Sequence, residues 1–242
     1  DVDGTRFTNA SDRPAAYTHY IQNVVNALKR ANAVRPARSK PYASALYFHS
    51  YLSTGTQDTG RFQDSVVRGV DGSQQWYDNC TQAGGPVKLM MPLFYADGTN
   101  TYTAVLDQYV DEAFALGADG LFHDEFPLSA VAYTYGAWDH HSAFLDPVNL
   151  TITHKVGSLV LLTHAHEMAI RRKVYRSGRF IVYNGSPMTR AWTTEAEAAG
   201  LPATLNENEN SIAWRTMHVQ LYTPIMLTRY GGNIGDEDPR YN

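Results

Sequence analysis

Two adjacent carboxylates, Asp124 and Glu125, are the residues best placed in this sequence to do chemistry. They directly follow a short apolar stretch, residues 119–123, which ends in His123. Paired carboxylates can cleave a glycosidic bond, because one acid protonates the leaving oxygen while the other stabilises, attacks or activates water. Neighbouring residues on a strand point to opposite sides, so only one of the two faces a site unless the strand has already ended. We favour Glu125 over Asp124 as the catalytic group.

The partner carboxylate is expected at the end of another strand. Glu207 and Glu209 follow a brief apolar stretch at 203–205, and their i, i+2 spacing puts both on one face of an extended segment. The competing interpretation is a solvated acidic loop, since loop carboxylates are usually exposed. Asp97 is a third candidate, although its Ala-Asp-Gly context is typical of a turn.

Polar and aromatic residues at the other expected strand ends could line a sugar site. Tyrosine and tryptophan present flat apolar faces with polar tips, which suit sugar rings, although most of them fill cores. The expected substrate-binding residues are His49, Tyr51, Tyr95, Asp97, His123, Trp138, Asn184, Arg229 and Tyr230.

Other kinds of catalytic centre have weaker support. His164, His166 and Glu167 lie close in sequence, but histidines at i, i+2 do not share a helix face, so we expect no metal. The sequence holds no Gly-x-Ser-x-Gly elbow for a serine nucleophile and no glycine-rich nucleotide motif. We therefore expect no cofactor.

The elements that must position these residues alternate between strands and helices. Apolar runs predict strands at 43–52, 87–95, 119–123, 179–183, 203–205 and 224–228. Helical spacing predicts helices at 17–33, 102–116, 154–177 and 212–221, with a short helix around 74–78. Alternation of this kind indicates a parallel sheet with ligands at the carboxyl ends of the strands.

The segment from Gly117 to Glu125 resembles the fourth-strand segment of many barrel glycoside hydrolases, which carry Gly-x-Asp-Gly, an apolar and an aromatic residue, and then Asp or Glu. The resemblance covers this segment strongly and the order of elements more loosely. It implies an α/β fold, a (β/α)8 TIM-like barrel, either whole or part of a longer chain. We expect residues 1–242 to form this single domain or most of it.

Composition limits the partners. The chain of 242 residues has 20 basic and 24 acidic side chains and no basic stripe, which argues against nucleic acid. No apolar run reaches the roughly 18 residues of a membrane span. Sequons for N-glycosylation begin at Asn9, Asn79, Asn149 and Asn184, which favours a secreted or extracellular protein.

These observations leave two functional hypotheses. The first is a glycoside hydrolase that acts on an oligo- or polysaccharide through two carboxylates. The second is an inactive barrel that serves as a glycan-binding or structural glycoprotein, because fold alone does not imply function. The chain begins at Asp1 and ends at Asn242 directly after a loop, so we also expect a processed or incomplete stretch of something longer.

Overall fold

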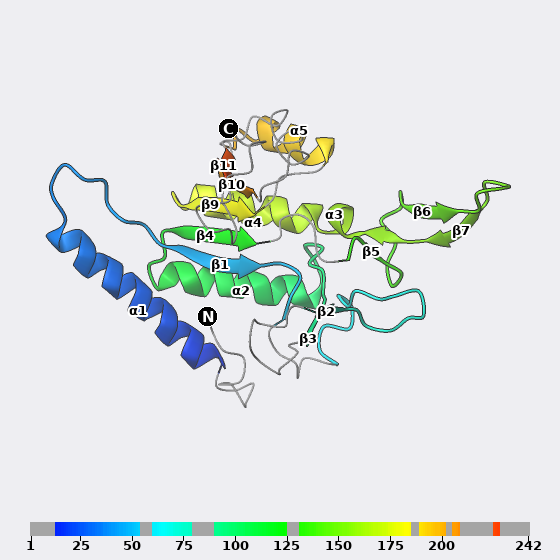
Figure 1. Ribbon diagram of the computed structural model, residues 1–242, viewed down its shortest axis with the longest axis horizontal. Helices are drawn as coiled ribbons and strands as arrows, with labels where there is room; N and C mark the ends of the chain where they lie inside the picture. The colour runs from blue at the N-terminus through cyan, green and yellow to red at the C-terminus, as the bar shows by residue number, and fades with distance from the viewer. Residues whose placement is uncertain are drawn as a thin grey trace, which may run out of the picture.

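A computed structural model places most of the chain (Figure 1). The residues that it describes are 13–53, 60–78, 90–124, 131–184, 189–201, 205–208 and 225–227.

The centre of the molecule is an open parallel sheet. Its strands, in spatial order, are β1 (Ala45–His49), β4 (Gly120–Asp124), β9 (Phe180–Asn184), β10 (Leu205–Asn208) and β11 (Ile225–Leu227). Each pair of neighbours is parallel. The spatial order follows the chain order without reversal. All the strands therefore present their carboxyl ends at the same edge.

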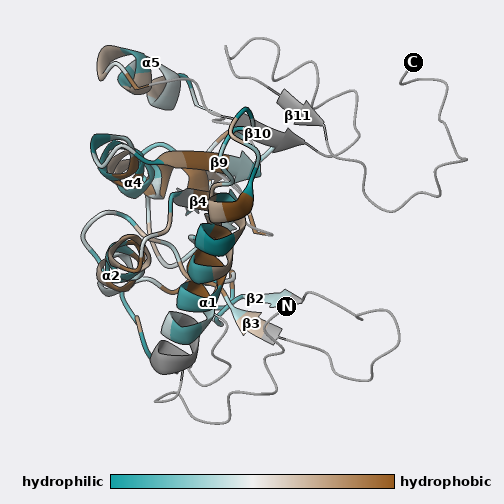
Figure 2. Ribbon diagram, turned by 90° about the vertical axis from the view of Figure 1, so that its left-hand side faces the viewer, coloured by the Kyte–Doolittle hydropathy of each residue, from teal (hydrophilic) through white to brown (hydrophobic). Residues whose placement is uncertain are grey.

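The helices of the described residues gather on one face of this sheet. They are α1 (Arg13–Val34), α2 (Thr101–Ala115), α3 (Leu159–Leu162), α4 (His164–Arg176) and α5 (Arg190–Ala198). Parallel strands are joined by right-handed crossovers, so a strand order that never reverses puts every crossover helix on the same side. Figure 2 shows α2, α4 and α5 aligned along that side of the strands.

The core lies between the sheet and these helices. Phe48, Leu121 and Ile181 point from three adjacent strands toward the helices, where they meet apolar residues such as Val110 of α2 and Val174 of α4. A second cluster packs Ile21 and Val25 of α1 against Leu46 and the end of α2. The alternating burial of β1 and β4 confirms that only one face of these strands is fully covered.

Local sequence explains how β4 is set in place. Asn100 caps α2 by accepting a hydrogen bond from the backbone of Thr103, and α2 ends before Gly117, whose φ of 95° suits glycine. Asp119 Oδ2 then accepts hydrogen bonds from the backbone N and the Oγ of Ser44, at 2.8 and 3.0 Å. Gly120 is required by close approach, since a Cβ there would lie 2.4 Å from Phe180 O. The Gly-x-Asp-Gly part of the motif thus fixes where β4 begins.

Short antiparallel pairs extend beyond the strand ends. They are β2 (Trp76–Asp78) with β3 (Met90–Pro92), β5 (Tyr133–Thr134) with β8 (Gly157–Ser158), and β6 (Ala143–Leu145) with β7 (Ile152–Lys155).

The expected barrel is wrong, because the sheet formed by the described residues does not close. The segment expected as the second parallel strand, 87–95, instead supplies β3, which pairs antiparallel with β2. β1 pairs directly with β4, so no position remains between them. The cause lies in residues 53–86, which provide no crossover helix in their described part. Parallel neighbours need such a connection, whereas antiparallel ones do not.

Two helices predicted from the sequence also differ from the observed elements. The region 74–78 forms strand β2 instead of a short helix. The expected helix 154–177 begins only at Leu159, because the preceding residues form β7 and β8, and it is divided at Thr163 into α3 and α4. The expected helix 212–221 lies outside the described residues. Among the described helices, none combines the length and the apolar character that a membrane crossing requires.

Candidate functional site

Four polar residues form a row across the carboxyl ends of neighbouring strands. His49 ends β1 and pairs in register with Asp124, which ends β4. His123 pairs with Tyr183, so the next position brings Asp124 beside Asn184, which ends β9. Asn184 in turn pairs with Glu207 of β10. We call His49, Asp124, Asn184 and Glu207 the strand-end row. The register of the strands brings these four positions to one edge of the sheet.

Asp124 is held from both sides within this row. Asn184 Nδ2 donates a hydrogen bond of 2.7 Å to Asp124 Oδ1. Tyr47 Oη donates one of 2.5 Å to Asp124 Oδ2. Hydrogen bonds to a charged acceptor are about twice as strong as neutral ones, so two of them fix the orientation of the carboxylate. Asp124 remains partly exposed. It is therefore an oriented carboxylate that solvent can still reach.

An aromatic surface lies beside Asp124 on the sheet face that no described helix covers. Tyr47 is 59% exposed, and its ring stacks on Phe122 with centroids 6.2 Å apart and an angle of 24°. Tyr47 and Phe122 are in register on β1 and β4, two residues before the strand-end row. The stacked pair gives a flat apolar platform next to a carboxylate, which is the combination that binds a sugar ring by one face and its hydroxyl groups by another.

A buried polar cluster lies on the opposite, helix-covered side of the strand ends. Ser50 Oγ lies 2.7 Å from His123 Nε2, and His123 Nδ1 lies 3.3 Å from Glu167 Oε2 of α4. All three residues are at most 1% exposed. We call Ser50, His123 and Glu167 the buried triad.

The charges of the buried triad are set by its burial. Burial raises the pKa of Glu167 to about 8, against a smaller opposing effect of a hydrogen bond with Ser50. The pKa of His123 is held well below its usual range, mainly by burial and to a smaller extent by the nearby His49 and His166. At neutral pH the contact between His123 and Glu167 therefore joins a neutral imidazole and a carboxylic acid. This avoids the cost of burying an ion pair.

His166 is a second fully buried histidine, on α4. Burial lowers its pKa to about 4, although Asp97 partly opposes the shift. The buried triad contains the residue types of a serine hydrolase catalytic triad. Ser50 is fully buried, however, so a substrate cannot reach its hydroxyl in this structure. We assign the triad a positioning role, because Ser50 follows His49 and His123 precedes Asp124 in the chain.

Three more of the expected substrate-binding residues lie outside the row, although Tyr51 N donates a hydrogen bond of 3.0 Å to His49 Nδ1. Tyr51 is fully buried, with its Oη 3.1 Å from Thr163 Oγ1. Tyr95 is also buried and donates to the backbone of Asp64. Asp97 accepts hydrogen bonds from Thr99 and from the backbone of Asn100, as a turn residue does. These three positions are structural.

His123 was expected at the site, but it faces α4 and is 0% exposed, so it supports the row from behind. Trp138 lies beyond the sheet near the β6–β7 hairpin, where Lys155 Nζ lies 4.2 Å from the centre of its ring. The remaining expected residues fall outside the described part of the chain: Glu125, Glu209, Arg229, Tyr230, Asn9 and Asn79.

The sequence analysis missed Tyr47, Ser50 and Glu167. The period-2 pattern of strand 43–52 could have identified Tyr47, because it lies two residues before His49 and therefore on the same face. Glu167 was noticed only as a possible metal ligand. Among the described residues, no group of three histidine, cysteine or acidic side chains is arranged to hold a metal ion.

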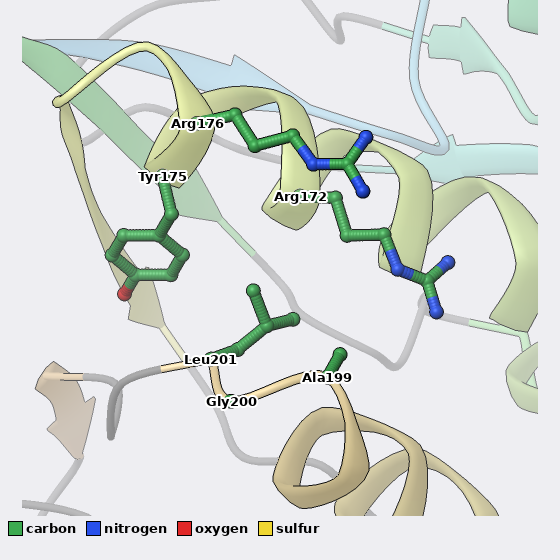
Figure 3. Close-up of a pocket in the computed structure, with 6 residues that line it drawn as sticks. All are labelled: Arg172, Tyr175, Arg176, Ala199, Gly200 and Leu201. Carbon is green, nitrogen blue, oxygen red and sulfur yellow. The ribbon is translucent and has the colours of Figure 1, made fainter.

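A separate pocket of about 400 Å³ lies between the end of α4 and the end of α5 (Figure 3). Arg172, Tyr175 and Arg176 line one side of it, and Ala199 to Leu201 line the other. Arg172 forms an ion pair with Glu195. The lining contains no carboxylate, so this pocket does not fit the expected chemistry.

Comparison of this chain with family models, with curated proteins and with solved structures finds no match. The geometry of the strand-end row therefore carries the functional argument by itself.

Proposed function

We propose that this protein binds carbohydrate at the strand-end row and hydrolyses a glycosidic bond there, with Asp124 as one of two working carboxylates. The observation that carries the proposal is the fixation of Asp124 by Tyr47 and Asn184 at an accessible strand end. A hydrolase needs a carboxylate of defined orientation, and two directed hydrogen bonds supply it. The stacked rings of Tyr47 and Phe122 offer the adjoining surface for a sugar.

The partner proposed for Asp124 is Glu207. It is in register with Asn184, so two strand spacings of about 4.8 Å separate its backbone from that of Asp124, roughly 10 Å in all. Inverting glycosidases hold their two carboxyl groups roughly 6.5–9.5 Å apart, and retaining ones roughly 5–5.5 Å. The wide backbone spacing favours an inverting reaction as the form of the proposal to test.

The proposed step uses one water molecule. Asp124 takes a proton from water, whose oxygen bonds to the anomeric carbon of the sugar. The bond from that carbon to the leaving oxygen breaks, and Glu207 gives its proton to the leaving oxygen. Glu125, the first choice from the sequence, is the alternative catalytic carboxylate because it directly follows Asp124.

A second candidate function is glycan binding without hydrolysis. It is favoured by the open sheet, since the face that carries Tyr47 and Phe122 is not enclosed by other strands among the described residues. In that case the row recognises sugar hydroxyl groups and breaks no bond. The four sequons support placing either function in a secreted or extracellular protein.

The test is a panel of aryl glycosides and natural oligosaccharides incubated with the unaltered protein and with Asp124→Asn, Glu207→Gln and Glu125→Gln. Loss of a catalytic carboxylate should lower kcat by roughly 100- to 10,000-fold with the fold retained, as judged by circular dichroism. NMR of the first product anomer distinguishes inversion from retention. Binding without cleavage by the unaltered protein would favour the second function. If the protein neither cleaves nor binds any glycan of the panel, both proposals are wrong.

A further inference from the structure

The β6–β7 hairpin projects from the body of the molecule, away from α1 (Figure 1). All of its strand residues, Ala143–Leu145 and Ile152–Lys155, are exposed. An isolated two-stranded hairpin is only marginally stable in water. The turn that closes this hairpin contains the sequon formed by Asn149, Leu150 and Thr151.

Asn149 is held in a defined turn. Asp146 Oδ1 accepts hydrogen bonds from the backbone N of Val148 and of Asn149, at 2.8 and 3.1 Å. Asn149 Oδ1 accepts a hydrogen bond of 2.6 Å from the Thr151 hydroxyl and one of 2.9 Å from the Thr151 backbone. Within the described part of the chain, Asn149 Nδ2 donates no hydrogen bond. Asn149 is an exposed residue, and the contact between its side chain and the Thr151 hydroxyl is already formed.

The residues on both sides of Asn149 are apolar and uncovered. Val148 is 91% exposed and Leu150 is 70% exposed. Leu150 also has a φ of 60°, an uncommon conformation for a branched side chain. Water contact of two such side chains at the tip of a projecting hairpin is unfavourable, and a bulky hydrophilic group attached between them would reduce it.

The sequon at Asn184 has the opposite setting. Asn184 is partly buried at the end of β9, and its Nδ2 already donates to Asp124. A glycan on this nitrogen would have to fit among the side chains of the strand-end row. The folded protein therefore accommodates a glycan at Asn149 and not at Asn184.

The geometry points to Asn149 as an N-glycosylation site whose glycan shields the apolar tip of the β6–β7 hairpin. The donor is a lipid-linked oligosaccharide pyrophosphate. A bond forms between Asn149 Nδ2 and the anomeric carbon of the sugar. The bond from that carbon to the pyrophosphate oxygen breaks, the lipid pyrophosphate leaves with the bonding electron pair, and one proton passes from Nδ2 to a base of the transferring enzyme. This inference does not depend on the proposed hydrolase activity.

The experiment is to express the full chain behind a secretion leader in eukaryotic cells and to map its glycopeptides by mass spectrometry. Protein from the medium and from the cell lysate is analysed, so that retention in the cell does not prevent the result. The Asn149 peptide should carry the glycan, and the Asn184 peptide should be unmodified. Thr151→Ala, which keeps Asn149 but destroys the sequon, should remove the glycan, whereas Thr151→Ser should retain it. Ser186→Ala, which destroys the Asn184 sequon, should leave the total glycan mass unchanged.

Shielding is measured separately by the binding of an apolar fluorescent dye. Enzymatic removal of the glycan from the folded protein should increase dye binding. Leu150→Asn combined with glycan removal should lower that increase, because it removes one of the two exposed apolar side chains. An unmodified Asn149 peptide, or a glycan on Asn184 of the folded protein, would overturn the site assignment. Unchanged dye binding after glycan removal would overturn the shielding role.

Discussion

The side-chain amide of Asn184 donates a 2.7 Å hydrogen bond to the carboxylate of Asp124 across the pairing of β9 with β4. The two residues are 60 positions apart in the chain, yet both end a strand at the same edge of the sheet. Because the two parallel strands end in register, two segments that are far apart in the sequence together fix the orientation of one carboxylate.

We predict that Asn184→Ala lowers activity or glycan affinity without unfolding the protein. A hydrogen bond to a charged group contributes about 1.5–3 kcal/mol, which corresponds to a roughly 10- to 100-fold decrease in kcat/KM or in affinity. Asn184→Asp should lower kcat/KM or affinity further than Asn184→Ala, because it places a second carboxylate beside Asp124. Steady-state kinetics and calorimetric titration with the best glycan of the panel measure both effects. Unchanged values for Asn184→Ala would remove the strand-end row as the site.

At position 47, two substitutions should separate the hydrogen bond from the ring stack. Tyr47→Phe loses the contact with Asp124 but keeps the stack on Phe122, so kcat should fall more than affinity. Tyr47→Ala loses both contacts, so affinity for the sugar should fall as well. Because Tyr47 is 59% exposed, neither change should shift the unfolding midpoint strongly. Equal loss of affinity in the two variants would contradict the platform role of the ring.

The buried triad should make stability depend on pH. The folded-state pKa of Glu167 is raised to about 8, so its stabilising effect is complete below its unfolded pKa and is lost as pH rises toward 8. The pKa of His166 is lowered to about 4 and that of His123 is also lowered, so these two groups destabilise the fold as pH falls below about 6.5. Stability should therefore peak near pH 6.5. Between pH 6.5 and 8 the ionisation of Glu167 lowers the stability, while deprotonation of the two histidines in the unfolded state offsets part of that fall.

Urea unfolding at pH 6.5 and at pH 8 measures this effect. At about 1.4 kcal/mol per pH unit, the loss from Glu167 outweighs the gain from the two histidines, and the free energy of unfolding should fall by roughly 1 kcal/mol over this interval. Glu167→Gln keeps the size and cannot ionise, so its decline should be much smaller. An equally steep decline in Glu167→Gln would show that another group is responsible.

Asp119 offers a comparison within the same segment. Its carboxylate holds the backbone and the hydroxyl of Ser44 at the start of β1, at the opposite end of the sheet from Asp124. Asp119→Ala should lower the free energy of unfolding by about 1–3 kcal/mol and leave kcat/KM unchanged under conditions where the protein is folded. Asp124→Asn should show the reverse pattern. A kcat/KM loss in folded Asp119→Ala would contradict the division of roles along β4.

The strand ends could be predicted from the sequence because each is marked by local signals. The helix stop at Gly117 and the switch from apolar residues to Asp124 locate the end of β4 within one residue of its observed position. The direction of the segment 87–95 could not be predicted, because a short apolar run reads the same whether its neighbour is parallel or antiparallel. The sequence before it offered only the short stretch around 74–78 as a crossover helix, and that stretch forms β2.

The buried triad was not predictable for a different reason. Glu167 is the only carboxylate of α4 and is spaced on one helical face with Ile170 and Val174, but the sequence alone does not pair it with a residue of the sheet. The role of Glu167 depends on β4, which places His123 opposite it although His123 lies 44 residues earlier in the chain. The motif that resembles glycoside hydrolases was informative about where a strand begins and ends. Asp119 and Gly120 show that much of it serves strand placement.

The unreversed strand order also has a consequence for synthesis. In the five-stranded sheet, each of the strands β4, β9, β10 and β11 pairs with the sheet strand that comes before it in the chain. Its partner on that side has therefore already left the ribosome when the new strand emerges. Domains form from the N-terminus onward as the chain is made, at about 5–20 residues per second. The sheet can therefore grow by one edge at a time, and β4 can dock on β1, with Asp119 against Ser44, before Asn184 exists to complete the row.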